Sequence, residues 1–430
     1  MPVAPLLRVA ALATAMAAAG VVAAGCARDP ELVTSAPPAG ADFMARYVAL
    51  GNSITAGFQS NGINDSTQRR SYARLLALAA GTRFAYPALA GRGCAPPLTD
   101  FATQTRLTLP GLPPSTATTC DLRTSASAAA LLNNVAVPNA NSFDPTGLAG
   151  GGYTALTQLF LGGRTQVERA SEVSPTFATV WIGNNDVLGS AVGGTTTGVT
   201  AEATFRANYD AMLDQLRAGS PALGRGVLIG VVDVTNVPLL VPAALFVPGS
   251  PAFSPAVQGA VQQLVGRPLQ LVNCPPTTGA LVAVPLFAQL RAATAQLPAG
   301  VPAPFACAPT PGPGGVQLGT VGVLDEGERA FFVQRVAAYN AHIAARAQSL
   351  GFLYLDPNPT LLGWRASGQV PPFPQLSAPP GTRVFGPYFS LDGVHPSTLA
   401  HLVFADTLRL RINRAYGSNI PAPDTTQVGR

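Results

Sequence analysis

The 430-residue sequence contains no lysine, and only 11% of its residues are charged. Its net charge of +5 comes from arginine, because all 26 basic side chains are arginines. These arginines are scattered, and only Arg69 and Arg70 are adjacent. No basic stretch alternates with aromatic residues, as it would on a nucleic-acid-binding surface. The composition therefore argues against a nucleic-acid partner, while 47% hydrophobic residues are enough for a substantial core.

Residues that bind metals are also scarce. The chain has only three histidines, His342, His395 and His401, and no C-x-x-C motif. No zinc site or other metal site is therefore expected. Nothing in the sequence implies an organic cofactor either.

Cysteines are few, but their number is informative. Apart from Cys26 near the N-terminus, four remain, and pairing of nearest neighbours would join Cys94 to Cys120 and Cys274 to Cys307. Four cysteines allow three connectivities, so this pairing is one prediction among three. Two disulfides would indicate an oxidising compartment outside the cytoplasm.

No transmembrane helix is predicted after the first 25 residues. Residues 1–25 form a short basic start and an Ala/Val-rich run, which is typical of an export signal. The segment Ala23-Ala24-Gly25-Cys26 looks like the lipobox of a lipoprotein signal peptide, which implies lipidation of Cys26. Ala27, in place of aspartate, favours the outer membrane. The alternatives are an ordinary secretory signal with a secreted or periplasmic product, or a retained membrane helix.

Short apolar runs that end in a glycine or a turn predict buried strands. Between them lie segments with the apolar spacing of amphipathic helices. Alternation of strand and helix favours an α/β fold with right-handed crossovers. We expect a three-layer α/β/α sandwich, flavodoxin-like, with about five parallel strands. The predicted strands are residues 46–50, 134–137, 179–182, 226–232 and 352–355, and the main helices are residues 71–80, 203–218, 325–350 and 401–416.

Composition suggests the boundaries of the folded part. Residues 26–43 contain prolines and small polar residues and are predicted to be a tether. Residues 44–421 would form one domain, followed by a tail at residues 422–430. Within the domain, residues from about 238 to 322 are rich in proline and glycine. We expect them to form one large irregular insertion that carries the second pair of cysteines.

Three short segments at strand ends or in the last loop carry candidate catalytic residues. The first, Gly51-Asn52-Ser53, would present a serine beyond the end of the first strand, where open α/β sheets bind ligands. The second contains Asn185, whose amide could donate to an oxyanion. In the third, Asp392 and His395 are spaced so that the carboxylate can hold the imidazole and leave its far nitrogen free to deprotonate a serine. Each segment alone has an ordinary structural explanation, as a helix cap or a turn.

Together these segments resemble the conserved blocks of SGNH/GDSL hydrolases. Gly51–Thr55, Gly183–Asp186 and Asp392–His395 resemble the serine, G-x-N-D and D-x-x-H blocks, in the family's order. The resemblance implies that Ser53 is the nucleophile, His395 the general base and Asp392 its partner. The chain has no G-x-S-x-G motif, which argues against the α/β-hydrolase fold.

The same resemblance implies an oxyanion hole made by the Ser53 N–H, the Asn185 amide and a backbone N–H from a further block. Residues 134–140 resemble that block, but its usual glycine is Asn139 here. Asparagine tolerates unusual backbone angles better than most residues. Asn139 is therefore the favoured donor, and Gly91 is the second choice. The residue before the serine, usually aspartate, is Asn52.

The expected function is that of an exported, lipid-anchored serine esterase or lipase acting through an acyl-enzyme. Its partners would be a small-molecule or lipid ester and, through the anchor, a membrane. Apolar residues of the insertion, such as Leu239 and Phe246, favour acyl chains, although they would equally pack a loop. The alternatives are an acyltransferase, a deacetylase acting on glycan or lipid, and a non-catalytic lipoprotein that binds them.

Overall fold

A computed structural model describes residues 38–428, apart from residues 122, 124–130, 148–154, 377–378 and 380–382. The predicted signal peptide, Cys26 and most of the predicted tether lie outside the described residues. Within them, no helix is long and apolar enough to cross a lipid bilayer.

A four-stranded parallel sheet forms the centre of the fold. It consists of β1 (Tyr47–Gly51), β2 (Phe177–Trp181), β3 (Arg225–Ile229) and β11 (Leu353–Leu355), in the order β1-β2-β3-β11. Nearly every residue of β1 to β3 is buried, because helices cover both faces of the sheet. This burial explains why the strands appear in the sequence as continuous apolar runs.

The remaining predicted strand, residues 134–137, lies along the outer edge of β1. The Val135 N–H donates to Ala49 O at 3.0 Å and the Val137 N–H to Gly51 O at 3.2 Å, in a parallel arrangement. This pairing is an isolated bridge, and the Asn134 side chain donates to Thr55 O at 2.8 Å. The resulting order, with this segment outside β1, is that of a flavodoxin-like sheet.

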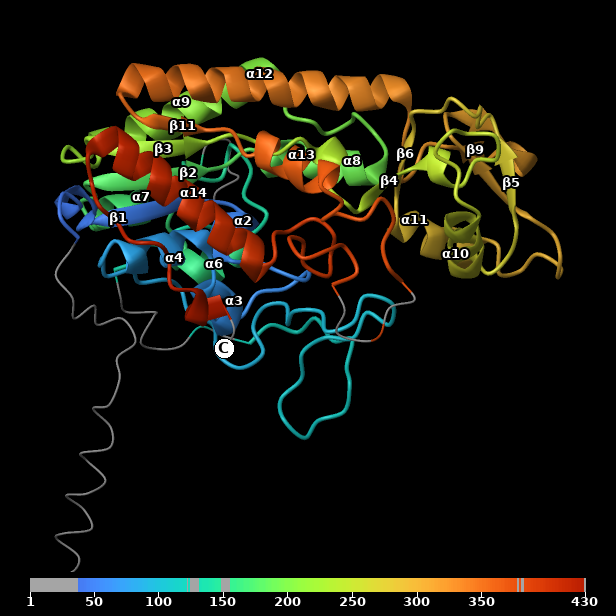
Figure 1. Ribbon diagram of the computed structural model, residues 1–430, viewed down its shortest axis with the longest axis horizontal. Helices are drawn as coiled ribbons and strands as arrows, with labels where there is room; N and C mark the ends of the chain where they lie inside the picture. The colour runs from blue at the N-terminus through green and yellow to red at the C-terminus, as the bar shows by residue number, and fades with distance from the viewer. Residues whose placement is uncertain are drawn as a thin grey trace, which may run out of the picture.

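Helices form the two outer layers (Figure 1). On one face α4 (Tyr72–Ala79) packs against α14 (Thr398–Tyr416); on the other, α9 (Glu202–Ala218) packs against α7 (Gln166–Glu172) and α12 (Glu326–Leu350). The predicted three-layer α/β/α class is confirmed. The shorter helices are α2 (Ser53–Ala56), α3 (Asp65–Arg69), α6 (Ala155–Leu161), α8 (Leu188–Gly193) and α13 (Asn358–Ala366). The 3₁₀ turns are η1 (Asp42–Met44), η3 (Asn184–Asp186), η4 (Val234–Asn236), η5 (Ala243–Leu245), η6 (Pro313–Gly315) and η7 (Thr425–Val428).

The ends of the long helices follow local capping rules. Asp325 caps α12 through a reciprocal pair of bonds with Glu328, and Gly351 ends the helix with φ 68°. Ser397 caps α14, which ends at Gly417 with φ 67°. These signals place the helices within three residues of their predicted bounds.

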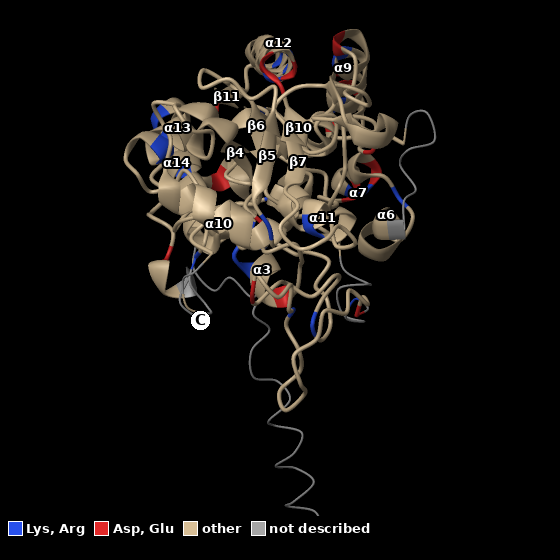
Figure 2. Cartoon of the chain, turned by 90° about the vertical axis from the view of Figure 1, so that its right-hand side faces the viewer, with Lys and Arg blue, Asp and Glu red and all other residues tan. Residues whose placement is uncertain are grey.

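The insertion differs from the prediction, because it is ordered and not irregular. Its strands β4 (Leu240–Pro242), β6 (Leu281–Ala283) and β10 (Val323–Leu324) form an antiparallel sheet, and β5 (Leu269–Val272) pairs in parallel with β7 (Ala303–Ala306). The helices α10 (Pro255–Val265) and α11 (Pro285–Ala293) pack together, and β8 (Thr310–Pro311) pairs with β9 (Gln317–Leu318). In Figure 2 the insertion faces the viewer.

The prolines of the insertion begin helices as well as interrupting strands. Pro255 and Pro285 stand at the first turn of α10 and α11, where a missing N–H costs nothing. Phe246, Phe287 and Phe305 pack edge to face in a buried cluster. A proline-rich segment with its own aromatic core can therefore be ordered.

Candidate active site

Ser53 lies at the carboxyl end of β1, as the first residue of α2. The chain turns sharply at Gly51, where a Cβ would lie 2.3 Å from Thr55 Oγ1 and 2.7 Å from Trp181 O. Asn52 caps α2 by accepting a bond from the Ile54 N–H at 3.1 Å. The buried strand, the glycine and the cap together hold the serine at the sheet edge.

Ser53, His395 and Asp392 form one hydrogen-bonded chain. His395 Nε2 lies 2.9 Å from Ser53 Oγ, and His395 Nδ1 lies 2.9 Å from Asp392 Oδ2. The serine and the histidine are 342 positions apart in the sequence. The ring of Phe58 lies 4.8 Å from the imidazole and covers one of its sides. The structure thus brings the three residues together in the geometry of a serine-hydrolase triad.

Asp392 is surrounded by donors. Its Oδ1 accepts from the backbone N–H groups of Val394 and His395 and from Ser390 Oγ, and its Oδ2 accepts from the Asn61 N–H at 2.6 Å. Burial alone would raise the pKa of Asp392, but His395 and these hydrogen bonds outweigh it and lower the pKa to about 2. The carboxylate is therefore ionised at neutral pH.

Two of the predicted oxyanion donors, Asn139 and Asn185, line the same cavity as His395 and Asp392. Asn139 adopts φ 66°, the left-handed conformation that a glycine would favour and an asparagine tolerates. Neither the Ser53 N–H nor the Asn139 N–H has an acceptor among the described residues. Asn185 lines the same cavity, and its Nδ2 donates one hydrogen to Ala140 O at 2.8 Å, which leaves the second hydrogen of the amide.

Gly91, the alternative donor, does not line this cavity. A Cβ built on it would lie 2.4 Å from Asp121 Oδ2, beside the disulfide-closed loop. The geometry therefore favours Asn139 over Gly91.

Two residues that hold other site residues in place were not predicted from the sequence. Asp186 is almost fully buried, and both its oxygens accept from Ser142, from the N–H at 2.9 Å and from Oγ at 2.6 Å, which ties residues 139–142 to the end of β2. Asn61 donates its backbone N–H to Asp392 from a turn in which Ser60 and Asn61 both have positive φ. The Asn61-Gly62 pair does predict a tight turn, but not the partner of its N–H.

The other two histidines lie away from the site. His342 bonds to Asp210 at 2.9 Å on the α12 surface. His401 is fully buried and accepts from the Tyr72 N–H at 3.2 Å, and burial lowers its pKa to about 3. Neither lines the cavity beside the triad. No group of three or more His, Cys, Asp or Glu residues that could hold a metal occurs in the described part of the chain.

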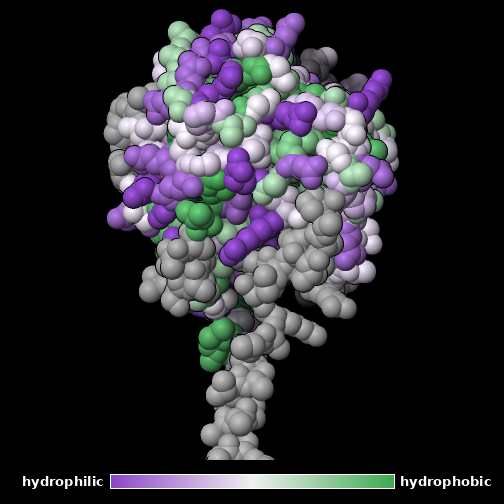
Figure 3. Space-filling model, turned by 90° about the vertical axis from the view of Figure 1, so that its left-hand side faces the viewer, coloured by the Kyte–Doolittle hydropathy of each residue, from purple (hydrophilic) through white to green (hydrophobic). Residues whose placement is uncertain are grey.

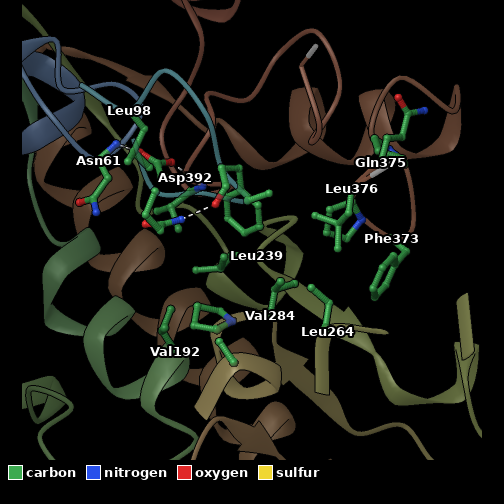
Figure 4. A pocket seen from close by; sticks show the side chains of 18 of the residues that line it. Asn61, Leu98, Val192, Leu239, Leu264, Val284, Phe373, Gln375, Leu376 and Asp392 are labelled. Carbon is green, nitrogen blue, oxygen red and sulfur yellow. Dashed lines mark hydrogen bonds between the residues drawn. The ribbon is translucent and has the colours of Figure 1, made fainter. Parts of the chain in front are cut away.

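A cavity of about 1430 Å³ opens beside the triad. Figure 4 shows Asn61, Leu98 and Asp392 on one side of it, Leu239, Val284 and Leu264 below, and Phe373 and Leu376 on the far side. The insertion supplies much of the wall through α10 and α11, α8 adds Leu188 and Val192, and residues 371–376 close the far side. Apart from the triad, Arg291 is the only charged residue lining the cavity within the described chain. A wall of this kind suits an apolar ligand.

Both predicted cysteine pairs are joined in the structure, Cys94 to Cys120 and Cys274 to Cys307. Each closes a segment that borders the cavity. The two disulfides indicate an oxidising compartment, as in extracellular or periplasmic proteins.

Comparisons with known proteins agree with this geometry. A family described as GDSL-like Lipase/Acylhydrolase matches residues 47–408. A search of the curated proteins finds no match to the chain. Among solved structures, the extracellular lipase from Streptomyces rimosus is similar, with 16% identity over 83% of this chain and 94% of its own, at a TM-score of 0.35.

Proposed function

Because the chain belongs to the GDSL-like lipase/acylhydrolase family, we propose that it is a serine esterase that hydrolyses carboxylic esters through an acyl-enzyme on Ser53. The family supports ester hydrolysis in general. The observation that carries the finer proposal is the chain of 2.9 Å contacts from Asp392 through His395 to Ser53, open to an apolar cavity.

In the first half of the reaction, Ser53 Oγ attacks the ester carbonyl carbon while His395 Nε2 takes the hydroxyl proton. The carbonyl oxygen becomes negatively charged and accepts from the Ser53 N–H, the Asn139 N–H and the free hydrogen of the Asn185 amide. The intermediate then collapses, the bond to the alcohol oxygen breaks, and His395 returns its proton to that oxygen.

In the second half, a water molecule replaces the alcohol. His395 removes a proton from the water as it attacks the acyl carbon, and the same donors hold the second oxyanion. Collapse releases the carboxylic acid and restores the Ser53 hydroxyl. Asp392 stays ionised throughout and holds the imidazole in the correct tautomer.

The apolar cavity favours an ester with a long hydrocarbon part. At about 1430 Å³ it exceeds the range of roughly 300–1000 Å³ that is usual for small-ligand sites, and its wall is mostly aliphatic. We therefore expect hydrolysis of p-nitrophenyl esters, with a preference for medium or long acyl chains over acetate.

The test compares the parent with Ser53→Ala, and with Ser349→Ala on the exposed end of α12 as a control. We expect Ser53→Ala to lower kcat at least about 10³-fold and Ser349→Ala to have no effect. Asn185→Ala should lower kcat by roughly 10² to 10³-fold with a small change in KM, because its amide acts mainly in the transition state. Full activity of Ser53→Ala would disprove the acyl-enzyme.

The same cavity has room for an acceptor alcohol beside an acyl chain, which favours acyl transfer as the second candidate function, with deacetylation of a glycan or lipid as its hydrolytic counterpart. Product analysis with and without a sugar or glycerol acceptor separates transfer from hydrolysis. A folded parent whose Ser53 does not react with an alkyl phosphonate probe would point to a non-catalytic binding protein.

We further propose that the chain is exported with residues 1–25 as a lipoprotein signal peptide, acylated at Cys26 and held to the outer membrane by a tether that begins at Cys26 and ends before η1. Two disulfides support export. Labelling with a radioactive fatty acid should mark the parent and not Cys26→Ser; equal labelling of both would exclude this anchor.

A further inference from the structure

The loop closed by Cys94 and Cys120 ends in an uncharged, apolar tip. No charged side chain occurs between Arg106 and Asp121. Within residues 107–114, here called the tip, Leu107, Leu109 and Leu112 are 36%, 48% and 58% exposed. The loop contains isolated bridges but no helix or strand, and Figure 1 shows it projecting below the body of the molecule.

We propose that this tip docks on a lipid surface and brings the mouth of the cavity to that surface. The inference rests on the proposed function and extends it, because it assigns a partner to a segment that the reaction itself does not use.

The exposure of three leucines within six residues is unusual for this chain. Burial of apolar surface is favourable in proportion to its area, and the exposed part of each of these leucines is still available for burial against a partner. The other exposed large apolar side chains of the described residues lie singly or in pairs on separate segments. On the side of the molecule seen in Figure 3, hydrophobic residues stand in small groups among hydrophilic and intermediate ones. An apolar cluster of this kind marks an interaction site.

The chemistry of the tip favours a lipid surface over a protein. Protein interfaces are rich in aromatic residues and arginine, and the tip has neither. It consists of leucine, proline, glycine and threonine, which offer apolar contact without charge. Its backbone lacks regular hydrogen bonding, so it would lie in the interfacial region of a bilayer, where water still reaches N–H and C=O groups, and not in the hydrocarbon core.

The tip is continuous with the cavity. The same loop supplies Leu98, Phe101 and Ala102 to the cavity wall, on the side where Asp392 lies. A long acyl chain that fills such a cavity resides in a bilayer or micelle before it is bound. A tip that lies in the lipid interface would therefore shorten the path from that interface to Ser53.

The base of the tip is held firmly. Arg106 is buried, and its Nη1 donates to Asn61 O at 2.8 Å and to Pro96 O at 2.7 Å. Backbone bonds join the Leu107 N–H to Pro97 O and the Arg106 N–H to Ser115 O. Docking of the tip would thus orient the cavity mouth and not merely tether the chain.

The experiment measures binding to phosphatidylcholine vesicles by co-sedimentation. It uses the chain with Cys26→Ser, exported so that both disulfides form, to remove any lipid anchor. The test variant carries Leu107→Ser, Leu109→Ser and Leu112→Ser. The matched control carries Val333→Ser, Leu362→Ser and Leu410→Ser, whose side chains are 43%, 50% and 53% exposed on three helices.

We expect the tip variant to bind vesicles at least about tenfold more weakly, while the control binds like the parent. Hydrolysis of a short soluble ester should be unchanged in both variants, which also shows that they are folded. Equal binding by the tip variant and the parent would overturn the proposal. So would a parent that binds only when anionic lipid is added, since arginines would then be responsible.

Vesicle binding needs no catalysis, so Ser53→Ala should bind like the parent. A parent that binds vesicles through the tip but hydrolyses no ester would contradict the proposed function and leave the docking surface standing. A parent that hydrolyses esters but does not bind vesicles would contradict the docking proposal and leave the proposed function standing.

Discussion

Two disulfide-closed regions form different parts of the wall of the same cavity and are built in different ways. The loop of residues 94–120 has no helix or strand, and its shape depends on Cys94–Cys120, a few backbone bonds and the buried Arg106. The insertion, from residue 238 to β10, has helices, strands and the aromatic cluster of Phe246, Phe287 and Phe305.

Because of this difference, we expect substitutions in the insertion to affect mainly the stability of the fold and substitutions at the base of the loop to affect mainly catalysis. Truncating a buried side chain of the insertion leaves a cavity in a packed core, so the cost falls on folding. Truncating a side chain of the loop disturbs little core, but the loop supports the triad through Asn61, whose N–H bonds to Asp392. Changes at the base of the loop, at Arg106 or the disulfide, should therefore alter catalysis, and changes in the insertion should alter stability and the fit of long chains.

The largest expected effect is from Phe287→Ala in the core of the insertion. Phe287 is fully buried, and its ring lies 5.8 Å from that of Phe246. We expect the free energy of unfolding to fall by about 3–5 kcal/mol, measured with urea. Activity on long-chain esters should fall more than activity on acetate. Leu297→Ala, exposed just beyond α11, is the control. An equal fall in its free energy of unfolding would show that the effect does not depend on the core of the insertion.

The second effect compares the two disulfides. By loop-closure entropy, replacing either pair of cysteines with serine costs about 3–4 kcal/mol. We expect the Cys94/Cys120 double variant also to lose hydrolysis of short esters at 25 °C, because the loop supports Asn61. The Cys274/Cys307 variant should keep that activity, since packing still holds the insertion. Loss of short-ester hydrolysis in the Cys274/Cys307 variant, with activity kept in the Cys94/Cys120 variant, would show that the insertion and not the loop supports the triad.

The third effect concerns Arg106, which joins the loop to the triad. Arg106→Met leaves the Asn61 and Pro96 carbonyl groups without their donor, at about 1–3 kcal/mol for the buried bond to Pro96, and lets the Asn61 turn move. We expect kcat on a short ester to fall roughly tenfold with little change in KM, and Arg106→Lys to restore part of it. Arg411→Met, on the exposed face of α14, should behave like the parent. A change confined to KM would place Arg106 in binding and not in positioning.

The smallest effect is a difference in pH dependence between the two sides. The pKa of Asp392, beside the loop, is lowered from 3.8 to about 2, so its ionised form stabilises the fold above pH 4 and this contribution is lost as pH falls from 4 to 2. Asp186 precedes α8, which packs against β10 of the insertion. Burial raises the pKa of Asp186 from 3.8 to about 6, so the fold loses stability as pH rises from 4 to 6.

Denaturant unfolding from pH 2 to 7 tests these opposite slopes. Asp186→Asn should remove the decline between pH 4 and 6, while Asp392→Asn should remove the loss between pH 4 and 2. If Asp186→Asn left the upper slope unchanged, another group would be responsible for it.

The sequence predicted the sheet well because buried parallel strands and capped helices are local patterns. The strands at β1, β2 and β3 are continuous apolar runs, and Asp325 and Ser397 mark helix starts. The insertion was mispredicted because its strands have only two to four residues, too few for a period to show. They pair across about 40 residues, β4 with β6 and β6 with β10. No local sequence pattern predicts these pairings.

The residues that we propose to react could be identified as candidates from short stretches of sequence. A serine after a glycine-ended strand, an Asn185 at a second strand end and an Asp392–His395 pair each need only a few neighbouring positions to be recognised. The hydrogen bonds that hold these residues in place could not be predicted in the same way. The Asn61 N–H on Asp392, the Arg106 bonds to Asn61 and the Asp186 clamp on Ser142 join distant segments through directional hydrogen bonds. Sequence spacing carries the chemistry of side chains, whereas the partner of a buried backbone group depends on which segments the packed core brings within hydrogen-bonding distance.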